Sequence, residues 1–292
     1  MLAQQLLNGL LLGATYALFA LGFTLMFGVL RVVNLTYGFY FTAGAFLALW
    51  LTQAGAPLFL ALPAAAIASG LIATLLDWLL LTRLRRAGAD ELASLMVTLG
   101  AVLALYAGMT AWLGPDIRRL PPGLIAAGAL EAFGLRITLA QILILAACAL
   151  LVGLLLWLMR GTRLGLAIRA MAERPDTAAL MGIATARLAA LVSFVSGALA
   201  GAGGVLIGLN FNAIHPYMGE SMMLRGFVVI VVGGLGNIFG ALVAGLLLGI
   251  IEVLTAGYIS SGLKEAVAFA LLVLVLWTRP AGLFGTTLAR KA

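Results

Sequence analysis

The side chains with the clearest chemical potential are charges set inside long apolar runs. Glu252 interrupts the run LLLGIIEVLTAGY, and Arg225 interrupts MMLRGFVVIVV, with Glu220 five residues before it. If these runs cross a bilayer, each charge costs ~2.5–3.5 kcal/mol on insertion scales, so each needs a partner or a function. We expect Glu220 and Arg225 to form a structural ion pair near an external helix end. Glu252 remains a functional candidate.

Uncharged polar side chains mark the ends and short breaks of the apolar runs: Asn34, Tyr37, Asn210, Asn212, His215 and Asn237. Broken helices at membrane depth are tolerated only where they pack inside protein or line a watery cavity. A path through the membrane is one explanation for such polar breaks. A satisfied structural hydrogen bond is the alternative explanation for each of them taken alone.

Neither catalysis nor metal binding is predicted. His215 is the single histidine and Cys148 the single cysteine, and no catalytic triad, carboxylate pair or ligand cluster stands out. The chain also lacks the G-x-x-x-x-G-K-[ST] phosphate loop, so we do not expect it to bind ATP by that device. No cofactor is expected on this chain.

A long polar stretch, residues 160–187, interrupts the apolar second half and carries five arginines. Apolar residues at three- and four-residue spacing predict one face of a short helix: Leu164, Ile168 and Met171. Pro175 is suited to begin a second helix, Gly182 to close it, and Thr185 to cap the next span. Two short amphipathic helices indicate a docking surface at the membrane's edge. A helical hairpin that lies on the membrane and binds nothing is the alternative.

Composition places these elements in a membrane. Hydrophobic residues make up 64% of the 292, charged residues only 9%, and the mean hydropathy is +1.19. A soluble domain of this size needs far more polar surface. The net charge of +7 does not indicate nucleic acid, because the basic residues cluster at the ends of apolar runs and serve there as topology signals.

Apolar periodicity and length predict an all-α polytopic protein with about eight or nine transmembrane or half-membrane helices. The expected segments are residues 6–30, 39–51, 58–81, 92–113, 137–159, 188–209, 222–232, 238–258 and 263–277, in a single domain over residues 1–292. Residues 114–136 are expected to form a loop. If the N-terminus is outside and all nine segments cross, twelve of the 17 basic residues lie inside, so we expect N-out and C-in. Pairs spaced G-x-x-x-G predict tight helix contacts within the chain.

Four segments resemble one family. GATYALFALGFTLMFGVLRVVNLTYG (13–38), TRLGLAIRAMAERPDTAALMGI (162–183), RGFVVIVVGGLGNIFGALVAGLLLGIIEVL (225–254) and TRPAGLFG (278–285) are similar to the LivH-type permease subunits of branched-chain amino acid ABC importers. They cover both ends and the middle of the chain. One departure is Asn34-Leu35-Thr36-Tyr37-Gly38, where the family usually has Asn-Phe-Ala-His-Gly or a similar sequence.

The resemblance implies a multi-pass protein of the cell inner membrane, half of a heterodimeric pore. Its partners would be a second related permease, two cytoplasmic ATPase subunits that bind the ATP, and a periplasmic substrate-binding protein. It also implies a coupling helix over residues 172–182, with the ATPase-contacting positions Ala172, Glu173, Arg174, Asp176, Ala179, Leu180, Met181 and Gly182. Together with the polar breaks, it leaves as translocation-path candidates Asn34, Tyr37, Asn210, Asn237 and Glu252.

The implied cargo is a branched-chain or related hydrophobic amino acid. Two alternatives stay open. Related permeases of the same family carry urea, short amides or aromatic acids, and the missing histidine, where this chain has Tyr37, bears on that choice. A stand-alone secondary transporter is the alternative from another class. It requires ion ligands in mid-membrane, where the sequence offers few carboxylates beyond Glu252, and it has no use for a docking loop.

Overall fold

The computed structural model describes residues 2–86, 88, 90–121, 124, 128–132 and 135–285. In this part of the chain, seven helical stretches are long and apolar enough to cross a membrane. They are α1 (Leu2–Leu30), α3 (Leu58–Leu76) continued by the π-helical turn η1 (Asp77–Leu81) and by α4 (Thr82–Arg86), α5 (Glu91–Leu113), α6 (Leu139–Gly161), α9 (Thr185–Phe211), α11 (Ile238–Tyr258), and α12 (Lys264–Thr278), which the 3₁₀ turn η2 (Ser261–Leu263) precedes.

Two further helices are shorter, α2 (Tyr37–Gln53) and α10 (Met218–Gly233). They are 17 and 16 residues long, less than the ~20 residues that a full crossing needs. With them, the described part has nine helices at membrane depth, which confirms the predicted all-α polytopic class. Between α6 and α9 lie the two short helices predicted there, α7 (Arg163–Glu173) and α8 (Pro175–Leu180).

The loop expected over residues 114–136 contains strand structure instead. Strand β1 (Ala129–Ala132) pairs antiparallel with β2 (Leu135–Thr138), with Ala129 opposite Thr138. Two β-branched residues end β2, and such residues favour strands. The Thr138 hydroxyl also accepts from the Gln141 amide in a capping box, so α6 begins at Leu139 rather than at the expected Ile137.

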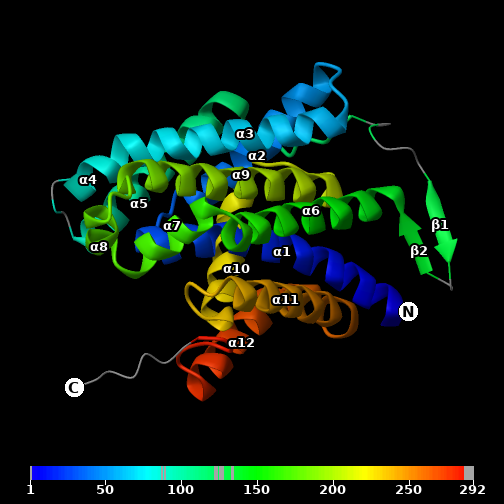
Figure 1. The fold of residues 1–292 in the computed structure, drawn as a ribbon. Coiled ribbons are helices and arrows are strands. Elements are labelled where there is room, and N and C mark those ends of the chain that lie inside the picture. The colour runs from blue at the N-terminus through cyan, green and yellow to red at the C-terminus, as the bar shows by residue number, and fades with distance from the viewer. Residues whose placement is uncertain are drawn as a thin grey trace.

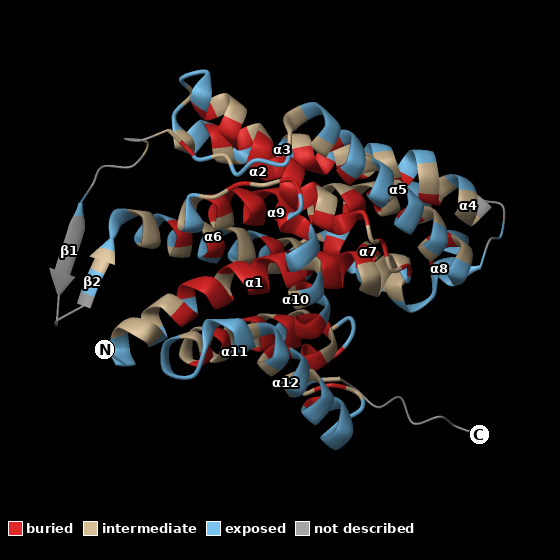
Figure 2. Ribbon diagram, turned by 180° about the vertical axis from the view of Figure 1, so that it is seen from behind, coloured by how far each residue is buried: buried red, intermediate tan, exposed pale blue. Residues whose placement is uncertain are grey.

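Helix α1 is the centre of the fold, with α9 and α11 packed along it (Figures 1 and 2). Helix α11 runs antiparallel to α1, because Gly13 lies against Leu246 while Gly28 lies against Gly236. A methyl group on Gly249 would overlap the backbone of Gly13. The G-x-x-x-G pairs therefore bring backbones together within this chain, which confirms the predicted tight packing.

The contact between α2 and α9 is equally close and gives a test of this packing. A methyl group on Gly204 would overlap the carbonyl oxygen of Phe41, so we expect Gly204→Ala to destabilise the fold by ~1–3 kcal/mol or more through overpacking. Gly153 on the outer side of α6 has open space around it, and Gly153→Ala is expected to be neutral or stabilising by up to ~1 kcal/mol. Thermal unfolding of both variants in the same detergent checks this, and equal midpoints would contradict it.

The two ends of the molecule differ in charge. Helices α4, α7 and α8 lie at one end, and the β1–β2 hairpin and the first residues of α1 at the other (Figure 1). The chain segment after α12 also reaches the α7 end, where Leu283 N donates to Val232 O at the close of α10. Lys264 and Arg136 lie at the hairpin end, beside Asn8 and Gln4. This separation of basic residues agrees with the charge distribution behind the expected N-out, C-in topology.

Candidate functional site

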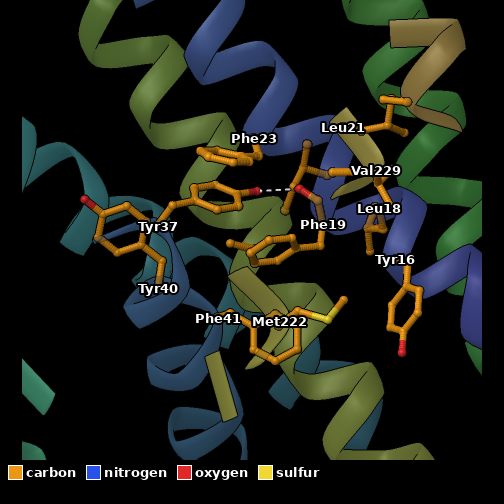
Figure 3. Packing of buried hydrophobic residues seen from close by; sticks show 14 of the residues in the cluster. Tyr16, Leu18, Phe19, Leu21, Phe23, Tyr37, Tyr40, Phe41, Met222 and Val229 are labelled. Carbon is orange, nitrogen blue, oxygen red and sulfur yellow. Dashed lines mark hydrogen bonds between the residues drawn. The ribbon is translucent and has the colours of Figure 1, made fainter. Parts of the chain in front are cut away.

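Helix α2 begins inside the molecule, beside the middle of α1. The chain leaves α1 at Arg31, whose φ of +52° is in the left-handed region, and returns into the core before α2 starts. The Tyr37 hydroxyl donates to the carbonyl oxygen of Phe19 at 3.0 Å, and the Tyr37 ring stacks on Phe23 (Figure 3). The short segment expected over residues 39–51 is therefore a helix that starts at a break inside the core.

Asn34 closes this break. Its side-chain oxygen accepts from the Thr36 amide at 3.0 Å and from the Thr36 hydroxyl at 2.5 Å. The Thr36 hydroxyl also lies 2.7 Å from the hydroxyl of Tyr40. All three side chains are buried. Asn34 and Tyr37 thus have the structural hydrogen bonds that were the alternative explanation for them, and their role in a path stays a prediction.

Helix α10 begins at the same place as α2. Its Gly219 amide donates to the Thr42 hydroxyl at 3.0 Å, and a methyl group on Gly219 would overlap the carbonyl oxygen of Gly38. Tyr106 of α5 closes the junction between the starts of α2 and α10. Its hydroxyl is so close to Gly38 that a methyl group added at Gly38 would lie 3.1 Å from it. The starts of two half-membrane helices therefore meet in the interior, an arrangement typical of sites inside transporters.

The predicted Glu220–Arg225 ion pair is wrong. Arg225 Nε lies 3.1 Å from a carboxylate oxygen of Glu252, and Arg225 Nη2 lies 3.6 Å from Glu265. The other oxygen of Glu252 accepts from the Tyr16 hydroxyl at 2.6 Å. A five-residue separation turns the two side chains about 140° apart on a helix, whereas Glu252 of the neighbouring α11 faces Arg225 directly. Glu220 is exposed.

Glu252 is therefore held in a cluster that joins four helices, α1, α10, α11 and α12. Its side chain is 1% exposed, and both carboxylate oxygens have partners. The Arg225 guanidinium also lies 6.0 Å from the centre of the Tyr16 ring. A buried charge with this set of partners is satisfied without a substrate.

The remaining path candidates lie at opposite ends. Asn237 caps α11 by accepting from the Gly240 amide at 3.0 Å, and its amide nitrogen donates to Phe284 O at 2.7 Å. Asn210 lines a hollow of about 400 Å³ at the hairpin end, together with Asn8 and Lys264. The structure does not bring the five path candidates into one cavity.

The polar stretch over residues 160–187, here called the docking stretch, folds as expected, with two differences. Ile168 and Met171 are buried on the inner face of α7, together with Gly165, but Leu164 is 48% exposed. Gly165 lies on the inner face in place of an apolar side chain. Helix α7 comes so close to the end of α6 that a Cβ at this position would overlap the backbone of α6. Thr185 does not cap α9: Ala184 is the cap residue, and Thr185 lies in the first turn of the helix.

Arg31 links the docking stretch to the break before α2. Its guanidinium donates to the carbonyl oxygens of Ala172 and Glu173, at 3.0 and 3.1 Å, where α7 ends. A cation is favoured there, because the last carbonyls of a helix carry partial negative charge. Cavities of about 500 and 360 Å³ lie on either side of Arg31. The end of α7 is therefore bonded directly to the residue at which the chain leaves α1.

Helix α8 and the turn after it present two large apolar side chains outward. Pro175 is its first residue, as predicted, and Gly182 ends the turn with φ of +84°. Ala178 is buried against the body, whereas Leu180 and Met181 are 88% and 79% exposed. Glu173, Arg174, Asp176 and Ala179 are also exposed. Two adjacent, fully presented apolar side chains at a charged end of the molecule have the chemistry of interface anchors.

Two residues of the junction are not among those that the sequence singles out. Tyr106 is the only residue with a polar side chain in the run AVLALYAGM. It lies inside an expected span, so a criterion limited to the ends and breaks of apolar runs does not select it. Tyr217 lies 5.7 Å from Tyr106, measured between ring centres. Among the described residues, no group of His, Cys, Asp and Glu side chains is suited to hold a metal ion.

Comparisons with known proteins agree with one another. Residues 5–276 match the family model described as the branched-chain amino acid transport system permease component. The permease protein LivH of the high-affinity branched-chain amino acid transport system of Escherichia coli is 33% identical over 97% of this chain and 95% of its own length. BraD of Pseudomonas aeruginosa is 34% identical with the same coverage. A probable LivH of Methanocaldococcus jannaschii is 29% identical over 92% of this chain and 88% of its own. No solved structure matches the chain.

Proposed function

Because the chain belongs to the branched-chain amino acid transport permease family, we propose that it moves branched-chain or related hydrophobic amino acids inward as the transmembrane subunit of an ATP-driven importer. The observation that carries this is the similarity over 97% of the chain to permeases whose names specify branched-chain amino acids. The protein is a multi-pass permease of the inner membrane and a non-catalytic component of a transport system.

A permease component works with other components, among them ATPases and a binding protein. We propose the finer assembly: this chain and a second related permease form the pore, two cytoplasmic ATPases bind the ATP, and a periplasmic binding protein delivers the amino acid. The exposed Leu180 and Met181 support a contact with the ATPases. The coupling positions named from the sequence, Ala172 to Gly182, surround that pair on α7, α8 and the turn after it.

The stand-alone secondary transporter has less support. Such a protein needs free ion ligands near mid-membrane. Glu252, the carboxylate that the sequence offers for this role, has both oxygens bonded to Arg225 and Tyr16. The Glu252 carboxylate thus holds helices together and is not free to bind an ion.

Reconstitution tests the proposal. The chain, co-expressed with the permease, ATPases and binding protein encoded beside it, is purified and placed in proteoliposomes. We expect ATP-dependent uptake of leucine, isoleucine and valine that requires the loaded binding protein. Preferential uptake of urea, acetamide or phenylalanine would reassign the cargo within the family. Uptake by the chain alone, driven by a proton or sodium gradient, would overturn the assignment to an ATP-driven importer.

A further inference from the structure

One face of α10 is exposed where the helix begins, at the junction with α2. Tyr217, Glu220, Ser221 and Leu224 recur at three- and four-residue spacing and all lie on this face. Figure 2 shows the exposed side of α10 in the middle of the view. The buried face of the same turns packs on α1 and α2 through Gly226 and Gly219. The first turns of α10 therefore present a carboxylate and two hydroxyls outward, level with the middle of α1.

This face of α10 is not suited to contact lipid. A carboxylate exposed to hydrocarbon at this depth is strongly unfavourable, so intramembrane charges face protein or water-filled space. The outer faces of α5, α6 and α12 differ, because their most exposed central residues are apolar: Leu103, Leu150 and Val273. Those faces are suited to acyl chains. Glu220 forms no salt bridge with any described residue, which leaves its carboxylate free for a group from outside this chain.

Tyr106 gives an independent indication of a ligand at the junction. Tyr106 is only 6% exposed, and its hydroxyl makes no well-aligned hydrogen bond with a described residue, although the Thr42 hydroxyl is close to it. The hydroxyl lies beside Thr42 and is directed at Gly38, at the start of α2. A buried hydroxyl without a partner is unfavourable. Water or a polar ligand that enters the junction would provide that partner.

We propose that this α10 face, together with Tyr106, lines the water-filled translocation path, and that Glu220 contacts the α-ammonium group of the passing amino acid. The helix dipoles place partial positive charge at the starts of α2 and α10, which favours the α-carboxylate on the side of Tyr106. A zwitterion thus meets a negative group and a positive helix start within one junction. This assignment rests on the proposed amino acid cargo, whereas the assignment of a water-filled face does not.

Cysteine accessibility separates water from lipid. In a Cys148→Ala background, which has no other cysteine, Ser221→Cys changes one atom on the proposed path. Leu150→Cys on α6 is the matched control, because it is also exposed and lies mid-helix. A membrane-impermeant methanethiosulfonate reagent attacks only the thiolate, which forms in water, so we expect Ser221→Cys to react at least about tenfold faster. We also expect loaded binding protein to slow that reaction in the assembled complex. Equal rates for the two cysteines would overturn the water-filled face.

Glu220→Gln tests the ammonium contact in the same proteoliposomes. We expect leucine uptake to fall about tenfold, the factor that one lost charge-assisted hydrogen bond gives, while binding-protein-stimulated ATP hydrolysis continues. Glu220→Asp, which keeps the charge, should retain more uptake than Glu220→Gln. Wild-type uptake by Glu220→Gln would overturn the contact. If the wild-type complex moves no branched-chain amino acid but Ser221→Cys still reacts rapidly, the proposed cargo fails and the path lining stands.

Discussion

Replacing Leu180 and Met181 together by aspartate is expected to detach the ATPases or to uncouple their hydrolysis from uptake. Both side chains are largely exposed at the end of α8 and in the turn after it, and apolar anchors of this kind usually dominate the energy of an interface. Two carboxylates in an apolar groove on the partner would be desolvated without a counter-charge, which is strongly unfavourable. The membrane-depth helices are unchanged, so the double variant should insert at normal levels.

The measurement is co-purification of the ATPases with each variant, followed by ATP hydrolysis and leucine uptake in proteoliposomes. Leu180→Met with Met181→Leu is the matched control, because it keeps apolar side chains of similar volume, and it should retain coupling. Glu173→Ala should have a milder effect, since a charge at an interface rim contributes little. If the double aspartate variant retains both its ATPases and its uptake, α7 and α8 form only a helical hairpin on the membrane surface.

Arg225→Ala is expected to cause a severe loss of folded protein in the membrane. It leaves the Glu252 carboxylate, only 1% exposed, without its cationic partner. Removal of one member of a buried pair costs ~3–5 kcal/mol, a large fraction of the stability of a typical protein. Glu265→Ala should be mild by comparison, because Glu265 is 68% exposed and lies 3.6 Å from the guanidinium.

A double substitution distinguishes this structural role from a role in transport. Arg225→Met combined with Glu252→Gln removes both charges and keeps similar volumes, so the amount of folded protein should recover towards the wild-type level. Membrane levels and the thermal unfolding midpoint in detergent are the measurements. Normal levels of Arg225→Ala with abolished uptake would show instead that Arg225 acts in the path.

The fold class and the docking stretch could be predicted from local information. Apolar runs of spanning length identify membrane helices because every backbone group in hydrocarbon must be bonded within the helix. Helix α11 has the predicted bounds, Ile238–Tyr258. Pro175 and Gly182 define the start and end of the α8 region through their own backbone preferences. Such signals depend on neighbours in the chain and need no knowledge of tertiary contacts.

Partners across helices could not be predicted in the same way. The sequence shows Arg225 five residues from Glu220 and 27 residues from Glu252, but only the packing of α10 on α11 brings Arg225 and Glu252 to 3.1 Å. The position of Leu164 outside the core likewise depends on the close approach of α6 and α7 at Gly165.

The sequence by itself determined that this chain is a polytopic helical membrane protein with two short helices between two of its spans, and four motif segments indicated the permease family. Composition, periodicity and turn chemistry are properties of local segments, so they can be recognised without knowledge of tertiary contacts. Tertiary structure alone decided that α2 and α10 begin together beside the middle of α1, that Glu252 is neutralised by Arg225, and that Glu220 faces outward. Those facts depend on distances between residues that are far apart in the chain, and only the packed helices set such distances.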